Sequence, residues 1–142
     1  MVGASLAGLL AARVLAPHFR EVVLVERDRL PEAPAFRAGV PQSRHVHLLL
    51  VRGARVLEAL LPGVLGALRA AGAVDVEWPR DLLWLGASGW SLRWSGGLRL
   101  VSCRRELLEW VVRRRVLALP PVRPVSAYPV RVEDGEIVVD LP

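Results

Sequence analysis

The sequence predicts an α/β fold in which a short strand, a helix and a second strand follow one another at the N-terminus. Residues 5–16 carry apolar side chains at helical spacing, and residues 21–26 form a β-branched apolar run. Residues 74–102 break into short strand-like pieces separated by glycine and proline. With 142 residues and 53% hydrophobic side chains, the chain is long and apolar enough to fill the core of one domain.

The bend at residues 3–8, Gly-Ala-Ser-Leu-Ala-Gly, has the spacing of a diphosphate-binding turn. Gly3 lets the chain turn tightly off a strand, and Gly8 lets the following helix lie close to the sheet. Ser5 replaces the middle glycine, where backbone N–H groups approach a diphosphate at the helix N-terminus. Glu26 follows Gly8 by 18 positions, where a carboxylate accepts hydrogen bonds from a ribose. The alternative is an ordinary strand-to-helix turn without a cofactor.

The boundaries of the other elements are predicted from prolines and glycines in the sequence. The first helix ends at Pro17, and a proline-rich loop covers residues 27–44. Helices are expected over 47–61, ended by Pro62, and over 64–71, closed by Gly72. An antiparallel insert follows over 74–102. The chain then returns to helix over 105–119, and strands are expected over 122–125, 130–133 and 136–141, the last two joined by a hairpin at residues 134–135.

Composition narrows the class of protein. The net charge of +5 raises the question of nucleic acid, but all 19 basic residues are arginines scattered among acids, and aromatic residues are not interleaved with them. We therefore expect no nucleic-acid partner and interpret Arg113 to Arg115 as a solvated helix end. Uncharged runs such as residues 2–12 and 82–92 span 11 residues, too few to cross a bilayer, and no basic region precedes the first apolar run. A cytoplasmic location is expected.

Cysteine and histidine give no metal centre. Cys103 is the single cysteine and is interpreted as an idle thiol. His45 and His47 form a His-x-His pair without a nearby carboxylate cluster, so we predict no metal site. We interpret the tryptophans at 90 and 94 as hydrophobic packing.

Four segments carry a family resemblance that covers residues 1 to about 120: GASLAGLLAARVL, VVLVERDRLP, GVPQSRHVHLLL and RELLEWVVRRRVL. Together they resemble the N-terminal half of bacterial FAD-dependent oxidoreductases of the aromatic-hydroxylase type, which include monooxygenases similar to 2-polyprenyl-6-methoxyphenol hydroxylase. The resemblance implies a Rossmann-like FAD-binding domain with an antiparallel β insert over residues 1–142. It also implies FAD as cofactor, NAD(P)H as electron donor, and oxygen transfer to a small organic substrate.

The resemblance assigns roles to individual residues. It implies that the cofactor is held by Gly3, Ser5 and Gly8 at the diphosphate, by Glu26 with Arg27 at the ribose, by Arg105 at the phosphate or ribityl side, and by Gln42 and His45 at the flavin edge. The residues alone leave alternatives open. Arg105 at a helix start is unfavourable beside the positive end of the helix dipole, and either a diphosphate or the nearby Glu106 or Glu109 would relieve that cost. His45 can also be interpreted as a loop or helix-capping residue.

Two departures from the family pattern lead us to expect a fragment. Only two residues precede Gly3, whereas a first strand normally spans about five, so this strand is incomplete. The chain also stops at Pro142, before the downstream Gly-Asp segment of similar proteins, and most of the substrate domain is absent. We expect the chain alone to be inactive as a monooxygenase. The alternatives are a non-catalytic nucleotide-binding module and an inactive gene fragment.

Overall fold

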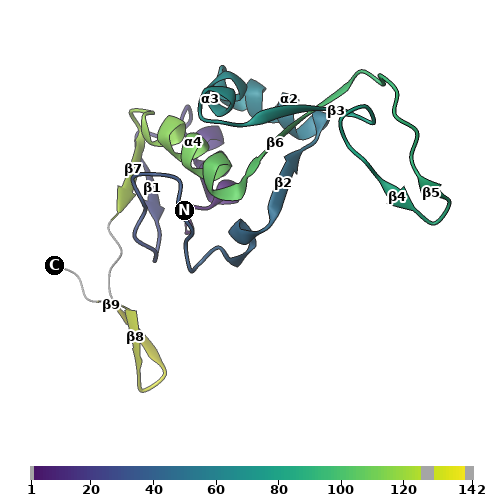
Figure 1. Cartoon of the computed structure of the whole chain (residues 1–142). Coiled ribbons are helices and arrows are strands. Elements are labelled where there is room, and N and C mark those ends of the chain that lie inside the picture. Colours follow the sequence, from purple (N-terminus) through teal and green to yellow (C-terminus); the bar gives the residue numbers. More distant parts are fainter. Residues whose placement is uncertain (1, 126–129, 140–142) are drawn as a thin grey trace.

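The computed structural model describes residues 2–125 and 130–139 and has a mixed α/β fold with several small sheets (Figure 1). In chain order the elements are α1 (Leu6–Leu15), β1 (Val22–Val25), the 3-10 turn η1 (Pro41–Arg44), β2 (Val46–Leu49), α2 (Val51–Leu60), α3 (Val64–Ala70), β3 (Val74–Trp78), β4 (Leu85–Gly86), β5 (Gly89–Trp90), β6 (Leu98–Arg104), α4 (Arg105–Leu117), β7 (Val122–Val125), β8 (Val130–Glu133) and β9 (Glu136–Val139).

The N-terminal strand–helix–strand unit forms as predicted. Val2 makes a parallel bridge to Val25, α1 follows, and β1 then pairs in parallel with β7. Val2 is the first described residue, and it forms a single parallel bridge with a side chain that is 88% exposed. The parallel run of Val2, β1 and β7 therefore places the bend at residues 3–8 at the edge where β1 ends.

A second, antiparallel sheet has the order β2-β6-β3, and it corrects one sequence prediction. The helix expected over 47–61 begins only at Val51, because Val46–Leu49 pairs with β6 instead. The apolar residues at 46–49 suit a strand as well as a helix. They form a strand because their backbone groups find hydrogen-bond partners along the edge of β6. The antiparallel insert expected over 74–102 is confirmed by the pairing of β3 with β6.

The core lies between the helices and the parallel strands. Helix α4 packs against α1 and α3, and its side chains Val112 and Val116 are fully buried. Leu9 of α1 and Leu24 of β1 meet them in the same apolar cluster. The structure thus holds α1 against α4 by apolar packing, and this contact brings the start of each helix to the same end of the molecule.

Strands β4 and β5 form an arm that extends from the body of the protein (Figure 1). Trp90 and Trp94 are 65% and 62% exposed, so the interpretation of these tryptophans as packing residues is wrong. The pattern misleads because both residues lie in an arm that extends from the body of the protein, away from its core. Trp84, at the start of this arm, packs against Trp78 at the end of β3, with 5.9 Å between the two ring centroids.

The C-terminal strands form the expected hairpin, in which β8 pairs with β9. Asp134 and Gly135 have φ angles of +51° and +83°, the left-handed values that a tight two-residue turn needs. Residues 140 and 141 of the predicted last strand lie outside the described residues. Among the described helices, none combines the length and the apolar character needed to cross a membrane.

Candidate functional site at the N-terminal glycine bend

The bend depends on both glycines. Gly3 adopts a φ of +89° and donates its N–H to the Val25 carbonyl at 2.7 Å, which closes the turn onto β1. Gly8, in the first turn of α1, lies so close to Gly3 that an added Cβ would sit 1.8 Å from the Gly3 carbonyl oxygen. The close approach of helix and strand that the sequence predicted for these positions is therefore present.

Glu26 lies beside the bend. Its Oε2 accepts the Ala4 N–H at 2.7 Å, and its Oε1 accepts the Asp28 N–H at 3.1 Å. Burial raises the pKa of Glu26, but these backbone N–H groups and the nearby Arg37 guanidinium outweigh burial and lower it. The carboxylate is thus held ionised at the C-terminal end of β1, where the sequence predicted a ribose-binding acid.

Arg37 joins the site, although no sequence pattern predicts this residue. It is only 5% exposed, and its Nε and Nη2 donate to Glu109 at 2.9 and 2.6 Å. Its Nη2 also donates to the Ala4 carbonyl at 3.3 Å, while Nη1 lies 3.2 Å from Glu26. Arg37 sits in an irregular loop without periodicity, so only the loop's length suggested a functional role.

Glu109 of α4 links Arg37 to the bend. It is 5% exposed, and its Oε2 accepts a hydrogen bond from the Ser5 hydroxyl at 3.1 Å. Ser5 stands at the N-cap of α1 but makes no side-chain capping bond to its own helix, because its hydroxyl points to α4 instead. Sequence reasoning considered Glu109 only as a partner for Arg105. The sequence signal for a buried acid here is that Glu109 lies among apolar residues of α4, such as Leu108 and Val112.

The interpretation of residues 113–115 as a solvated helix end is wrong. Arg113 is 5% exposed, donates to the Pro31 carbonyl and lies 3.8 Å from Glu109. Burial lowers its pKa, and Glu109 counters part of that effect. Arg114 alone is exposed, with its guanidinium over the Trp110 ring. Arg113 is buried because the loop that carries Pro31 covers this side of α4.

Arg105 is the positive group at the bend that lacks an acidic partner. Its Nη2 donates to the Ser5 hydroxyl at 3.4 Å, and its Nη1 lies 3.5 Å from Nε2 of His47. Its Nε is buried without an acceptor, and burial lowers its pKa while Glu109 offsets part of the shift. Within residues 2–125 and 130–139, no carboxylate oxygen lies within the 4.0 Å of an ion pair with Arg105, and Glu109 relieves only part of the cost of its burial.

The other three predicted site residues stay at the surface. Gln42 and His45 are exposed on and just after η1, and the Gln42 carbonyl accepts the His45 N–H at 3.1 Å. The Arg27 side chain is 78% exposed, and its Nε lies 3.9 Å from Asp28. The structure thus brings Gly3, Ser5, Gly8, Glu26 and Arg105 together and leaves these three residues outside that cluster. Among the described residues, no three His, Cys, Asp or Glu side chains converge as metal ligands.

The site fits an anion more readily than a neutral ligand. The first turn of α1 contains no acidic residue, and its N-cap side chain does not cap it, so the helix itself supplies nothing that offsets the partial positive charge of its N-terminus. Arg105 adds a full charge beside Ser5 with a buried nitrogen that lacks an acceptor. A phosphate-bearing ligand would supply the missing acceptors, and this is the chemistry of helix N-termini that bind diphosphates.

Acid should weaken the fold through Glu26. Because its folded pKa lies below the ordinary value of 4.5, its contribution to stability is complete above that pH and is lost as the pH falls through the lower folded pKa. We expect the free energy of unfolding, measured by urea titration from about pH 7 down to about pH 3, to fall below about pH 4.5. Glu26→Gln should be less stable at neutral pH and should lose less stability on acidification. An equal loss in both proteins would remove Glu26 from this role.

Fold and site together define the chain as a mixed α/β protein with a strand–helix–strand unit around a glycine bend. Among characterised sequences it is similar to Protein Rv3254 of Mycobacterium tuberculosis (strain ATCC 25618 / H37Rv), with 47% identity over 127 residues. The match covers 87% of this chain, and the chain spans only about 27% of the length of that relative. No protein-family model matches the chain.

These comparisons correct the family resemblance. The similar protein has a name without any reference to flavin or hydroxylation, and no flavoprotein family model matches. The assignment to FAD-dependent oxidoreductases of the aromatic-hydroxylase type is therefore wrong. The glycine bend that suggested it is also what the close approach of a helix to a strand requires. A functional proposal rests on the geometry of the bend.

Proposed function

We propose that the bend binds the diphosphate of an adenine dinucleotide, with FAD as the cofactor, and that the chain is the cofactor-binding portion of an oxidoreductase. The observation that carries this proposal is Arg105, a half-buried cation beside Ser5 and the start of α1 without a carboxylate partner among the described residues. NAD(P)H as electron donor, oxygen as co-substrate and a small organic substrate belong to the same proposal.

Charge supports the diphosphate half of the proposal. Arg105 stands at the first residue of α4, where the helix dipole repels a cation, and its buried Nε forgoes a hydrogen bond. Both costs are offset by an anion placed between this guanidinium and the start of α1. Ser5 is the residue that bridges the two helices here, because its hydroxyl contacts Glu109 and Arg105 at once.

Glu26 supports the ribose half. A carboxylate offers about four lone-pair positions for hydrogen bonds. Two are taken by the Ala4 and Asp28 N–H groups, and Arg37 lies close enough for an ion pair. The remaining capacity suits a sugar hydroxyl, which donates. In a flavoenzyme the bound FAD would supply the electron-transfer chemistry, and this chain's residues would hold and orient it.

A second candidate function is binding of a nucleotide without catalysis. The exposure of Gln42 and His45 favours it, because side chains that point into solvent do not form a pocket for a flavin ring. Such a module needs only the residues at the bend, which would recognise ADP as well as FAD. The two functions therefore differ in whether the flavin half adds to the affinity.

Arg105→Ala should separate binding from folding. We expect it to weaken FAD binding about tenfold or more, because a charge-assisted contact to a phosphate is lost, while thermal stability stays unchanged or rises as a desolvated cation is removed. Arg104→Ala is the matched control, since the Arg104 side chain is the preceding residue and 74% exposed. Binding is measured by the change in flavin fluorescence on titration of the purified chain, and stability by circular dichroism.

The same titration decides between the candidates. FAD binding tighter than ADP binding supports the cofactor proposal, and equal affinities support the nucleotide-binding module. If the chain binds neither nucleotide, or if Arg105→Ala binds FAD as tightly as the parent chain, the bend is a structural turn and the proposal is wrong.

A further inference from the structure

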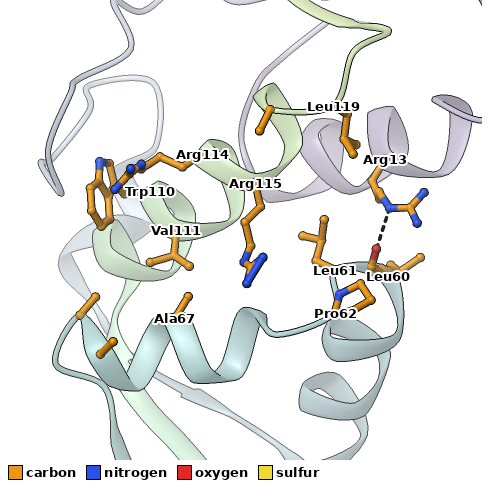
Figure 2. A pocket seen from close by; sticks show the side chains of 13 residues that line it. Arg13, Leu60, Leu61, Pro62, Ala67, Trp110, Val111, Arg114, Arg115 and Leu119 are labelled. Carbon is orange, nitrogen blue, oxygen red and sulfur yellow. Dashed lines mark hydrogen bonds between the residues drawn. The ribbon is translucent and has the colours of Figure 1, made fainter.

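A second candidate site is a cavity of about 730 Å³ between α1, α3 and α4 (Figure 2). It is formed by the face of α4 that carries Val111 and Arg115, whereas the glycine bend contacts Arg105 and Glu109 of the same helix. Its size falls within the range of pockets that hold small organic molecules. The cavity is therefore a separate place for a ligand, independent of the bend.

The walls of this cavity are apolar. Leu61, which follows α2, and Val111 of α4 are each 5% exposed and lie on opposite sides of it, as Figure 2 shows. Ala67 of α3 and Leu119 after α4 add further apolar surface. A hydrocarbon or aromatic group would lose its contact with water here and gain contacts on several sides.

The polar groups that line the cavity carry one sign of charge. They are Arg13, Arg114 and Arg115, and the lining contains no acidic residue. The Nε of Arg13 donates to the Leu60 carbonyl at 2.6 Å, and Arg114 lies over the Trp110 ring. Neither contact neutralises its arginine. For the described part of the chain, none of the three arginines has a carboxylate oxygen within 4.0 Å.

Arg115 is the arginine best placed for a ligand. Figure 2 shows its side chain extending between α4 and α3 toward the middle of the cavity, and its Nε is buried without a hydrogen-bond acceptor. The positive charge of Arg115 helps to lower the pKa of Glu58, after the larger effects of the Leu65 and Gly63 N–H groups. Glu58 accepts both of those N–H groups, so its oxygens are already engaged.

We propose that this cavity binds an amphipathic carboxylate, with the apolar tail against its apolar walls and the carboxylate at Arg115. The apolar walls recognise the tail, and the Arg115 guanidinium recognises the anion. The planar guanidinium of Arg115 can take a carboxylate through two parallel hydrogen bonds. A neutral or cationic amphiphile of the same length lacks this second interaction.

The test is calorimetric titration of the purified chain with octanoate, with octyltrimethylammonium and acetate as matched probes. We expect octanoate to bind, and octyltrimethylammonium and acetate to bind about tenfold more weakly or not at all, because each lacks one of the two interactions. Arg115→Gln should weaken octanoate binding about tenfold while leaving any FAD binding unchanged. Ala67→Phe, which fills the cavity, should abolish octanoate binding by a second route.

Arg104→Gln serves as control, because Arg104 is exposed and does not line the cavity. Circular dichroism of each variant shows whether it is folded before it is titrated. The proposal is overturned if octanoate does not bind the folded parent chain, if acetate or octyltrimethylammonium binds equally well, or if Arg115→Gln and Ala67→Phe both bind octanoate as the parent does. Unchanged binding by Arg104→Gln alongside a loss in Arg115→Gln supports it.

Discussion

Gly8→Ala should destabilise the protein by about 3 kcal/mol and remove nucleotide binding at the bend. An added Cβ would lie 1.8 Å from the Gly3 carbonyl oxygen, a backbone atom that cannot rotate away. Relief requires α1 to move off the strand, and this movement also displaces Ser5 from Arg105. The gain of about 1 kcal/mol in helix propensity is too small to offset the overlap. Urea unfolding followed by circular dichroism measures the loss.

Gly66→Ala is the matched control for this substitution. Gly66 is also a helical glycine, in α3, but an added Cβ there would meet no heavy atom within 4 Å. We expect Gly66→Ala to leave nucleotide binding unchanged and to stabilise the protein by about 0.5 to 1 kcal/mol. If both glycine variants unfold at the same urea concentration, the close approach of α1 to Gly3 is not a constraint on this fold.

Glu109→Ala should lower the free energy of unfolding by about 3 to 5 kcal/mol, because it leaves the buried Arg37 without its main partner. Glu109 and Arg37 are each 5% exposed and share two hydrogen bonds, of 2.9 and 2.6 Å. After the substitution Arg37 keeps Glu26 but loses the carboxylate that satisfies its Nε. Ser5 loses its acceptor as well. Thermal and urea unfolding measure this effect, together with the loss of FAD binding that a displaced Ser5 would cause.

Asp75→Ala removes a carboxylate from an ion pair of similar geometry at the surface. Arg69 donates to Asp75 through two nitrogens, but their side chains are 46% and 40% exposed. Solvent screens such pairs, so we expect a loss below about 1 kcal/mol. A Glu109→Ala variant as stable as Asp75→Ala would show that the buried cluster adds little to the fold.

The sequence predicted the elements of the bend because each one depends on local signals. A helical run after Gly8, a stop at Pro17 and a β-branched run before Glu26 specify a strand–helix–strand unit over a stretch of about 25 residues. The structure confirms this unit. Gly3, Ser5, Gly8 and Glu26 lie together because neighbouring elements carry them, and the short connections leave few alternative arrangements.

The parts that failed depend on contacts between distant segments. Residues 46–49 form a strand because β6 is present to pair with them, and no residue nearby in sequence indicates this. Arg37 reaches Glu109 across 72 positions, so a loop arginine and a helical acid become a buried pair without any shared pattern. Arg113 was misplaced for the same reason, since the loop carbonyl that it contacts lies 82 positions away.

The buried cluster of Arg37 and Glu109 has a consequence for the order of assembly. Ser5 contacts Glu109 across 104 positions, and Arg37 donates to the Ala4 carbonyl, so the bend acquires its final shape only after α4 has docked. Contacts between such distant parts form slowly, because the entropy cost of closing a long loop comes before the stabilising free energy of the contact. During synthesis on the ribosome, the bend at residues 3–8 would therefore wait until α4, about 100 positions further along, has emerged before it takes its final shape.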